Sequence, residues 1–520
     1  MTKRPNFLFI MTDQHRADWL GCMGHPIIET PYIDSIAAQG TMFKNFHVAS
    51  PVCMPNRASF LTGRMPSVHG LRYNGCVLPK HANTFVDVLA ASGYNTAAIG
   101  KVHLEPFLPQ PINQQRPSPV RPVTEAWQDG FEDYNHEQPD RFQGSEYPEF
   151  EDGYYGYQHV EIVTGHGNRP GGHYQQWLRK NCKDWRRFTD PANELPHDYS
   201  CPHAYRTPMP EELYPTTWVA DRAIDYLDKQ MDNDDPFFAF VSFPEPHYPF
   251  NPPGKYWDMY WPDQFDLDLP YEAHRNPNPA MEYLTEQWKI GALPPTPQSA
   301  FRADKQHIRE AMALTGGMIA LIDEQVGRIL DTLEANGLFE DTVVIFNSDH
   351  GDYLGDFDFL LKGALQFKSV TRVPMIWSDP ELRLGLTTEA LGSTIDLSST
   401  ILARAGLEAF NGMQGQNLLP HLFENAPLAD QILIEFNDLI PRMGFEKCAK
   451  ARTLLASNWR FTFYQDCNWG EFYDLVADPH ETNNLWHDPT YAEAKLELSL
   501  MLNNSLTKQM DESPLARRRA

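Results

Sequence analysis

The chain has 520 residues, of which 42% are apolar and 12% aromatic, enough to bury a large core. Its formal net charge of -26 excludes a nucleic acid or an anionic membrane surface as the expected partner. An anionic ligand would therefore need a local cluster of positive charge. The seven cysteines are scattered and form no Cys-x-x-Cys pair, which argues against a disulfide scaffold or a zinc ribbon.

The first apolar run, residues 7–11, is too short for a signal-peptide core or a membrane span. No later stretch approaches the roughly 18 consecutive apolar residues that a membrane helix needs. We therefore predict a cytoplasmic protein with no membrane partner.

Residues 6–11 form an almost continuous apolar run, which predicts a buried parallel strand that ends at Asp13 and Gln14. Ligand sites in open α/β sheets form at the carboxyl ends of strands. Taken alone, Asp13 could instead cap the following segment.

A Cys-x-Pro-x-Arg motif spans residues 53–57, and its cysteine lies just before a segment, residues 56–62, that can continue as a helix. Free N-H groups at a helix start favour negative charge, and Arg57 would lower the pKa of the Cys53 thiol, so Cys53 could be a nucleophile. The alternative is a buried, inert cysteine before a proline turn. Asn74 lies in a polar turn that either contacts substrate or is only a turn.

Residues 95–99 predict another strand, and Lys101 and His103 follow it in an extended segment whose alternation would project both side chains to one face. Residues 105–215 are rich in proline, aromatic and acidic residues and show poor periodicity, so we expect a loop-rich cap insertion over the site. A helix over residues 216–229 and a strand over 236–243 then lead to His247.

The longest helical pattern covers residues 304–336 and precedes a strand over residues 342–346. This strand ends at Asp349 and His350, and a carboxylate and an imidazole at a strand tip suit a divalent cation. Asp13 would occupy the matching end of its own strand in the same sheet.

Short strands separated by turns after residue 420 predict a small antiparallel sheet with a closing helix near residues 491–506. The predicted fold is α/β, with a large mixed, mostly parallel sheet flanked by helices over residues 1–420. Residues 421–520 would form an α+β subdomain.

The motif at residues 53–64 together with Gly-Lys-x-His at 100–103 and Pro-His-x-Pro-Phe at 246–250 resembles the type I sulfatases of the alkaline phosphatase superfamily. The resemblance implies an alkaline-phosphatase-like fold, conversion of Cys53 to formylglycine by a formylglycine-generating enzyme, and one divalent metal ion. It implies metal ligands at Asp13, Gln14, Asp349, His350 and the modified Cys53, and catalytic roles for Arg57, Lys101, His103, His247 and Lys362.

Sulfatases place Asp-Asp where this chain has Asp13-Gln14, a variant that resembles choline sulfatases and phosphonate monoester hydrolases, so Ca²⁺ and Mn²⁺ both stay open. The predicted function is hydrolysis of small sulfate monoesters, as in arylsulfatases. One alternative is a phosphonate monoester or phosphodiester hydrolase, which Lys101 and His103 disfavour; another is a non-catalytic binder of sulfated ligands. The resemblance also implies a homodimer or homotetramer.

Overall fold

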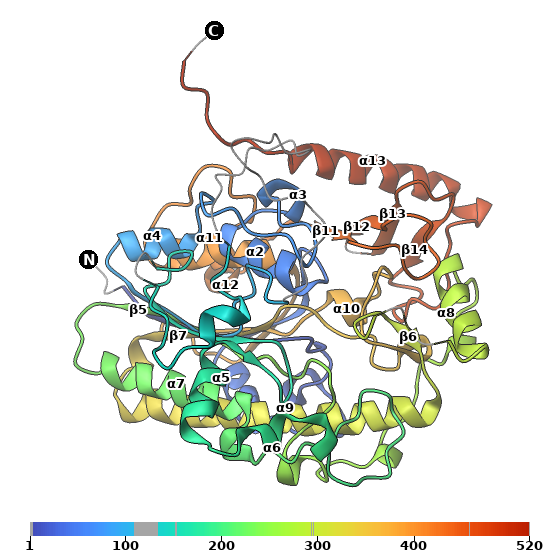
Figure 1. The fold of residues 1–520 in the computed structure, drawn as a ribbon. Coiled ribbons are helices and arrows are strands. Elements are labelled where there is room, and N and C mark those ends of the chain that lie inside the picture. The colour runs from blue at the N-terminus through green and yellow to red at the C-terminus, as the bar shows by residue number, and fades with distance from the viewer. Residues whose placement is uncertain are drawn as a thin grey trace, which may run out of the picture.

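An eight-stranded sheet runs through the centre of the protein, whose computed structural model describes residues 4–108, 134–150, 153–292, 294, 296–456 and 458–518 (Figure 1). The strand order is β10-β2-β9-β7-β1-β5-β3-β4, and neighbours are parallel except that β9 runs antiparallel to β2 and β7. The strands are β1 (Asn6–Thr12), β2 (Thr41–His47), β3 (Asn95–Gly100), β4 (His159–Thr164), β5 (Phe237–Ser242), β7 (Thr342–Ser348), β9 (Met375–Ser378) and β10 (Leu386–Ser393).

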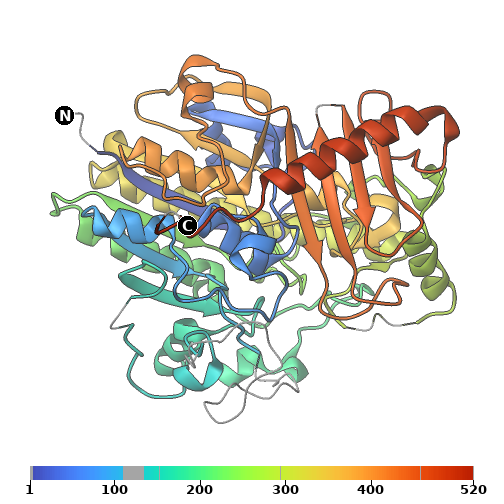
Figure 2. The same ribbon diagram turned by 90° about the horizontal axis from the view of Figure 1, so that it is seen from above.

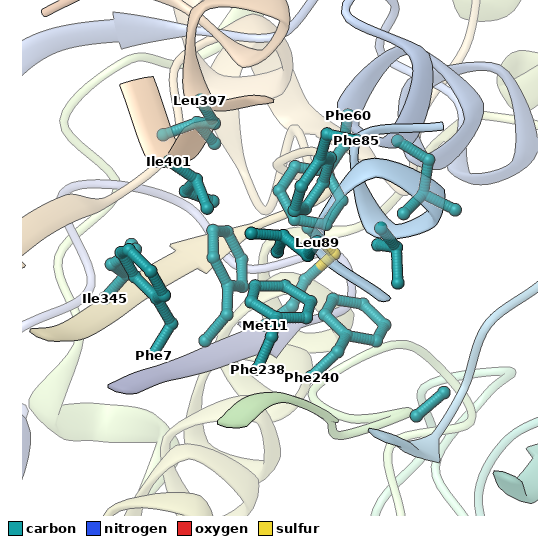
Figure 3. Packing of buried hydrophobic residues seen from close by; sticks show 14 of the residues in the cluster. Phe7, Met11, Phe60, Phe85, Leu89, Phe238, Phe240, Ile345, Leu397 and Ile401 are labelled. Carbon is teal, nitrogen blue, oxygen red and sulfur yellow. The ribbon is translucent and has the colours of Figure 1, made fainter. Parts of the chain in front are cut away.

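Helices cover both faces of this sheet, which explains why its central strands are apolar throughout. Along β1, Phe7, Phe9 and Met11 enter one core, whereas Leu8 and Ile10 enter the other. Figure 3 shows the first core, where Phe60 and Phe85 from helices pack on Phe238 and Phe240 of β5.

The helices divide into two layers (Figure 1). One layer contains α2 (Cys53–Thr62), α4 (Phe85–Ala91) and α11 (Thr394–Arg404), and the other α1 (Pro31–Ala38), α5 (Gly172–Asn181), α7 (Pro215–Gln230) and α9 (Lys305–Ala335). Shorter or peripheral helices are α3 (Pro66–His69), α6 (Trp185–Thr189), α8 (Pro279–Lys289), α10 (Lys368–Thr371) and α12 (Leu419–Glu424).

A second, antiparallel sheet of four strands lies beside the main one (Figure 2). It comprises β11 (Gln431–Asn437), β12 (Lys450–Ala456), β13 (Trp459–Tyr464) and β14 (Gly470–Asp474), and α13 (Ala492–Lys508) lies across it through Leu498 and Leu502. The Glu435 amide of β11 donates a hydrogen bond to the Ala49 carbonyl (2.8 Å), so this sheet is tied to the segment that precedes α2. A two-stranded ribbon, β6 (Phe301–Arg302) with β8 (Phe359–Leu360), completes the described strands.

The predicted fold class is confirmed: a large, mostly parallel sheet with helices on both faces, and a small antiparallel sheet near the C-terminus. The boundary at residue 420 stays a prediction. Of the expected cap over residues 105–215, residues 109–133 and 151–152 lie outside the described part, and the rest contains β4 and α5 as well as loops. Within the described ranges, no helix is both long and apolar enough to cross a membrane.

Candidate active site

The carboxyl ends of neighbouring strands bring the predicted site residues to one edge of the main sheet. β1 and β7 pair in a register that places Thr12 opposite Ser348, so the next residues, Asp13 and Asp349, lie side by side. Lys101 follows β3, and its amide donates to the Ser242 carbonyl at the end of β5 (2.9 Å). Parallel pairing therefore brings together residues far apart in the sequence.

Cys53 is the first residue of α2, three residues before the predicted helix start, and its side chain is buried. The Lys362 ammonium and the Asn74 amide nitrogen each lie 3.8 Å from its sulfur. Burial alone would raise the pKa of this thiol, but the Lys362 and Lys101 ammonium groups outweigh burial and lower the pKa to about 7. The site thus favours an anion at position 53.

Four buried side chains, Asp13, Cys53, Asp349 and His350, place one potential ligand atom each within 4.8 Å of one another. The His350 Nδ1 donates to the Gly351 carbonyl (2.9 Å), so Nε2 carries the lone pair, 3.5 Å from one oxygen of each carboxylate. Nε2 accepts from the Lys362 ammonium (3.0 Å), which a cation bound here would displace. Asp13 Oδ1 is buried without a hydrogen-bond partner among the described residues. An orphaned carboxylate oxygen beside a correctly oriented imidazole fits a divalent cation.

Gln14 adopts the left-handed region (φ 62°), uncommon for a residue with a side chain. Its amide donates to Asp349 Oδ1 (3.1 Å), its side-chain nitrogen donates to Asp352 Oδ2 (2.5 Å), and its side-chain oxygen accepts from Lys362 (2.7 Å). The strained backbone therefore holds the Gln14 oxygen beside the carboxylate cluster and against Lys362.

Arg57, one turn after Cys53 on α2, is buried and spans the cluster. Its Nε donates to Asp349 Oδ2 (2.8 Å), Nη1 donates to the Lys101 carbonyl (2.6 Å) and the Ser242 hydroxyl (2.9 Å), and Nη2 lies 3.5 Å from Asp13 Oδ2. One guanidinium thus connects helix α2 to the ends of β1, β3, β5 and β7.

Lys101 extends into the site and donates to Asp13 Oδ2. Burial alone would raise the pKa of Asp13, but Lys101 and the neighbouring histidines lower the pKa well below its ordinary value. His103 departs from the predicted extended geometry: β3 ends at Gly100 (φ 105°), and His103 itself is left-handed (φ 59°). Its ring packs on Phe107, and its buried Nδ1 has no hydrogen-bond partner in the described structure.

His247 lies in the loop after β5, and its Nδ1 donates to the Tyr248 carbonyl (2.7 Å). Its ring stacks on His166, a residue from the loop after β4, with centroids 3.6 Å apart. Burial, His166 and Lys362 hold the pKa of His247 well below its ordinary value, so the ring is neutral at pH 7.

The structure brings the predicted residues to the same edge of the sheet, including Asn74, whose side-chain oxygen accepts from the Met54 amide (3.1 Å) and whose side-chain nitrogen lies 3.8 Å from the Cys53 sulfur. The sequence analysis missed His166 and Asp352. His166 carries only a weak signal, because the run before it, residues 159–164, has three apolar residues among three polar ones. Asp352 is the last residue of the Asp-His-Gly-Asp motif.

Comparison with known proteins agrees with this geometry. The Sulfatase family model matches residues 5–407, and the N-sulphoglucosamine sulphohydrolase C-terminal model matches residues 355–509. The chain is 28% identical to the ulvan-active sulfatase of Formosa agariphila (98% of this chain, 82% of that protein) and 28% identical to the arylsulfatase of Clostridium perfringens (94% and 92%). It is similar in structure to a phosphonate monoester hydrolase of Agrobacterium radiobacter, with TM-score 0.76, 25% identity, and coverage of 99% and 100%.

Proposed function

We propose, from the premise that this chain belongs to the sulfatase family and hydrolyses sulfate monoesters, that the reaction takes place at a formylglycine residue made from Cys53. One observation supports this assignment above the others. Cys53 is buried at the first position of α2, 3.8 Å from the Lys362 ammonium, and its sulfur belongs to the same cluster as Asp13, Asp349 and His350. A negatively charged ester group at this point would meet concentrated positive charge in a protein that is acidic overall.

Formylglycine, once formed, supplies a hydrated aldehyde as nucleophile. The protein's own residues hold the ester and move protons. Arg57 keeps Asp13 and Asp349 in place, and the Lys101 ammonium would donate to a sulfate oxygen. His103, whose Nδ1 is free among the described residues, would accept a proton when sulfate is released. Lys362 would supply a proton to the leaving oxygen, and His247, whose own proton is held by the Tyr248 carbonyl, would assist there by contact rather than by proton donation.

Asp13, Asp349 and His350 would hold one divalent cation, Ca²⁺ or Mn²⁺, with Gln14 as a neutral oxygen donor beside them. Such a cation would supply positive charge to the sulfate oxygens. Metal analysis of purified protein, followed by chelation and refilling with each ion separately, would identify it.

The proposed nucleophile is tested by mass spectrometry of the Cys53 peptide, paired with turnover of an aryl sulfate by the same sample. We expect the aldehyde mass, and loss of turnover in Cys53→Ala. Native, active protein that carries only the unmodified thiol would refute the formylglycine assignment.

A phosphonate monoester hydrolase is the second candidate, favoured by Gln14, His350 and the likeness to the Agrobacterium radiobacter structure. Lys101 and His103 at the site favour sulfate instead. Rates on the sulfate and methylphosphonate esters of one phenol decide between them, and we expect the sulfate ester to react faster. A non-catalytic binder would turn over neither ester.

Modification of Cys53 implies a formylglycine-generating enzyme as a maturation partner. The homodimer or homotetramer and the cytoplasmic location stay predictions from the sequence. Light scattering on the purified protein tests the first, and fractionation of cells tests the second.

A further inference from the structure

We propose that His166 is a positioning residue for the sulfatase reaction, fixing both the Lys101 ammonium and the ring plane of His247. The assignment deepens the proposed function and rests on it. His166 lies in the loop after β4, the edge strand next to β3. It approaches the site from the side of β3, whereas Asp349 and His350 approach it from the side of β7.

Two contacts carry the inference. His166 Nε2 lies 2.6 Å from Lys101 Nζ and 3.5 Å from Asp13 Oδ2, and the His166 and His247 rings stack with an interplanar angle of 7°. A lysine ammonium can only donate, so Nε2 of His166 accepts from it and the ring keeps its proton on Nδ1. The same imidazole therefore directs one N-H of Lys101 while its face covers His247.

The His166 loop is built to hold this position. Gly165 and Gly167 on either side have positive φ angles of 78° and 65°, which favour glycine. A Cβ at residue 167 would lie 2.7 Å from the ring of Pro249, in the loop that carries His247. The backbone at Gly167 therefore packs directly on the Pro249 side chain, with no room for a larger residue at 167. The site end of β4 is thus docked against the loop that supplies His247.

Together these contacts leave Lys101 and His247 little freedom. Lys101 is held between Asp13 Oδ2 and His166 Nε2, and His247 is fixed by the Tyr248 carbonyl at Nδ1 and by the His166 ring on its face. Without His166, Lys101 would turn fully toward Asp13, and His247 would keep only its contacts with Tyr248, the hydrogen bond to the carbonyl and the ring 4.5 Å away between centroids. Displacements of about 1 Å in such groups cost on the order of 100-fold in rate.

The same residues could suggest a second cation, because Asp13, His166 and His247 also place potential ligand atoms within 4.8 Å of one another. On this side the Asp13 oxygen is Oδ2, which already accepts from Lys101, and the same ammonium contacts His166; the oxygen without a partner, Oδ1, faces His350 instead. The geometry therefore favours a positioning role over metal binding.

The test uses a series of aryl sulfates whose phenols differ in pKa, measured with the mature, metal-loaded enzyme. His166→Ala is compared with His166→Phe, which keeps an aromatic face for His247, and His166→Gln, which keeps an acceptor for Lys101. His159→Ala is the matched control, since His159 lies at the far end of β4, pairs with Glu161 and is 35% exposed. Melting temperature and metal content are measured for each variant.

We expect His166→Ala to lower kcat/KM by roughly 10- to 100-fold, with a larger loss for poorer leaving groups. His166→Phe should regain the wild-type dependence on leaving-group pKa, His166→Gln should regain most of the rate on good leaving groups, and His159→Ala should match wild type. Folded His166→Ala within 2-fold of wild type on every ester would overturn the assignment. So would an equal loss in all three variants, or a loss that follows metal content. Wild-type protein inactive on every sulfate ester would instead overturn the proposed function itself.

Discussion

Replacing Arg57 by methionine keeps an unbranched side chain but removes the guanidinium that connects α2 to four strand ends. Two buried carboxylates, Asp13 and Asp349, then lose a cationic neighbour, and the Lys101 carbonyl loses its donor. Removing one partner of a buried ion pair costs about 3–5 kcal/mol, and an orphaned buried acceptor about 1–3 kcal/mol. These losses overlap because one group causes both, so we expect about 4 kcal/mol, a large share of the 5–15 kcal/mol typical of folded domains.

Urea unfolding of metal-free protein, followed by tryptophan fluorescence, measures this difference. Arg328→Met is the control, because Arg328 pairs with Asp221 at 2.7 Å on the surface, where both side chains are at least a third exposed. Exposed pairs contribute about 0.2–1 kcal/mol. If Arg57→Met lost no more stability than Arg328→Met, the guanidinium would not be the charge that balances the buried carboxylates.

Three further predictions concern acid, backbone geometry and metal. Burial lowers the pKa of His69 from 6.5 to about 3, so acid protonates this histidine in the unfolded chain before the folded protein. The free energy of unfolding therefore does not depend on His69 above pH 6.5 and falls by about 2 kcal/mol at pH 5. His69→Gln should make the urea midpoints fall less steeply over this range by the share of this one residue, while other buried histidines with a lowered pKa keep theirs; an unchanged slope would contradict the assignment. Gly100→Ala should lower the melting temperature far more than Gly337→Ala. Both glycines have positive φ, so a side chain at either position costs about 1–2 kcal/mol in backbone strain. A Cβ at 100 would in addition collide with the Ser242 carbonyl, whereas one at 337 meets open space. Removal of the metal by a chelator should lower the melting temperature reversibly, because Asp13 Oδ1 would then be buried without any partner. An unchanged melting temperature would count against a metal at this cluster.

The central strands could be predicted from the sequence because both faces of the sheet are covered, which makes β1, β5 and β7 apolar at nearly every position. The two edge strands could not. β4 and β10 carry polar residues among the apolar ones and are partly exposed, so their sequence pattern does not indicate a strand. β9 runs antiparallel to both of its neighbours, and nothing in its four residues indicates that direction.

Asp13, Asp349 and His350 were predictable because they directly follow strands, whereas the roles of the other predicted site residues came from the resemblance to the sulfatases. His166 was missed for the same reason as β4: it follows an edge strand in a region that lacks periodicity. The alternation of residues also could not predict the backbone geometry at Lys101 and His103. Positive φ angles at Gly100 and His103 turn the chain where an extended segment was predicted. Sequence periodicity describes regular backbone, and these residues lie where the backbone stops being regular.

The hydrogen bond from Glu435 to Ala49 has a consequence for biosynthesis. If Cys53 is modified as proposed, the modifying enzyme must reach it before its side chain is buried, and the preceding segment at Ala49 is tied to β11, which leaves the ribosome about 380 residues later. At about 5–20 residues per second, this delay is roughly 20–80 s. The order of elements along the chain would therefore give the proposed maturation a time window, which slower translation lengthens and earlier folding of the C-terminal sheet shortens.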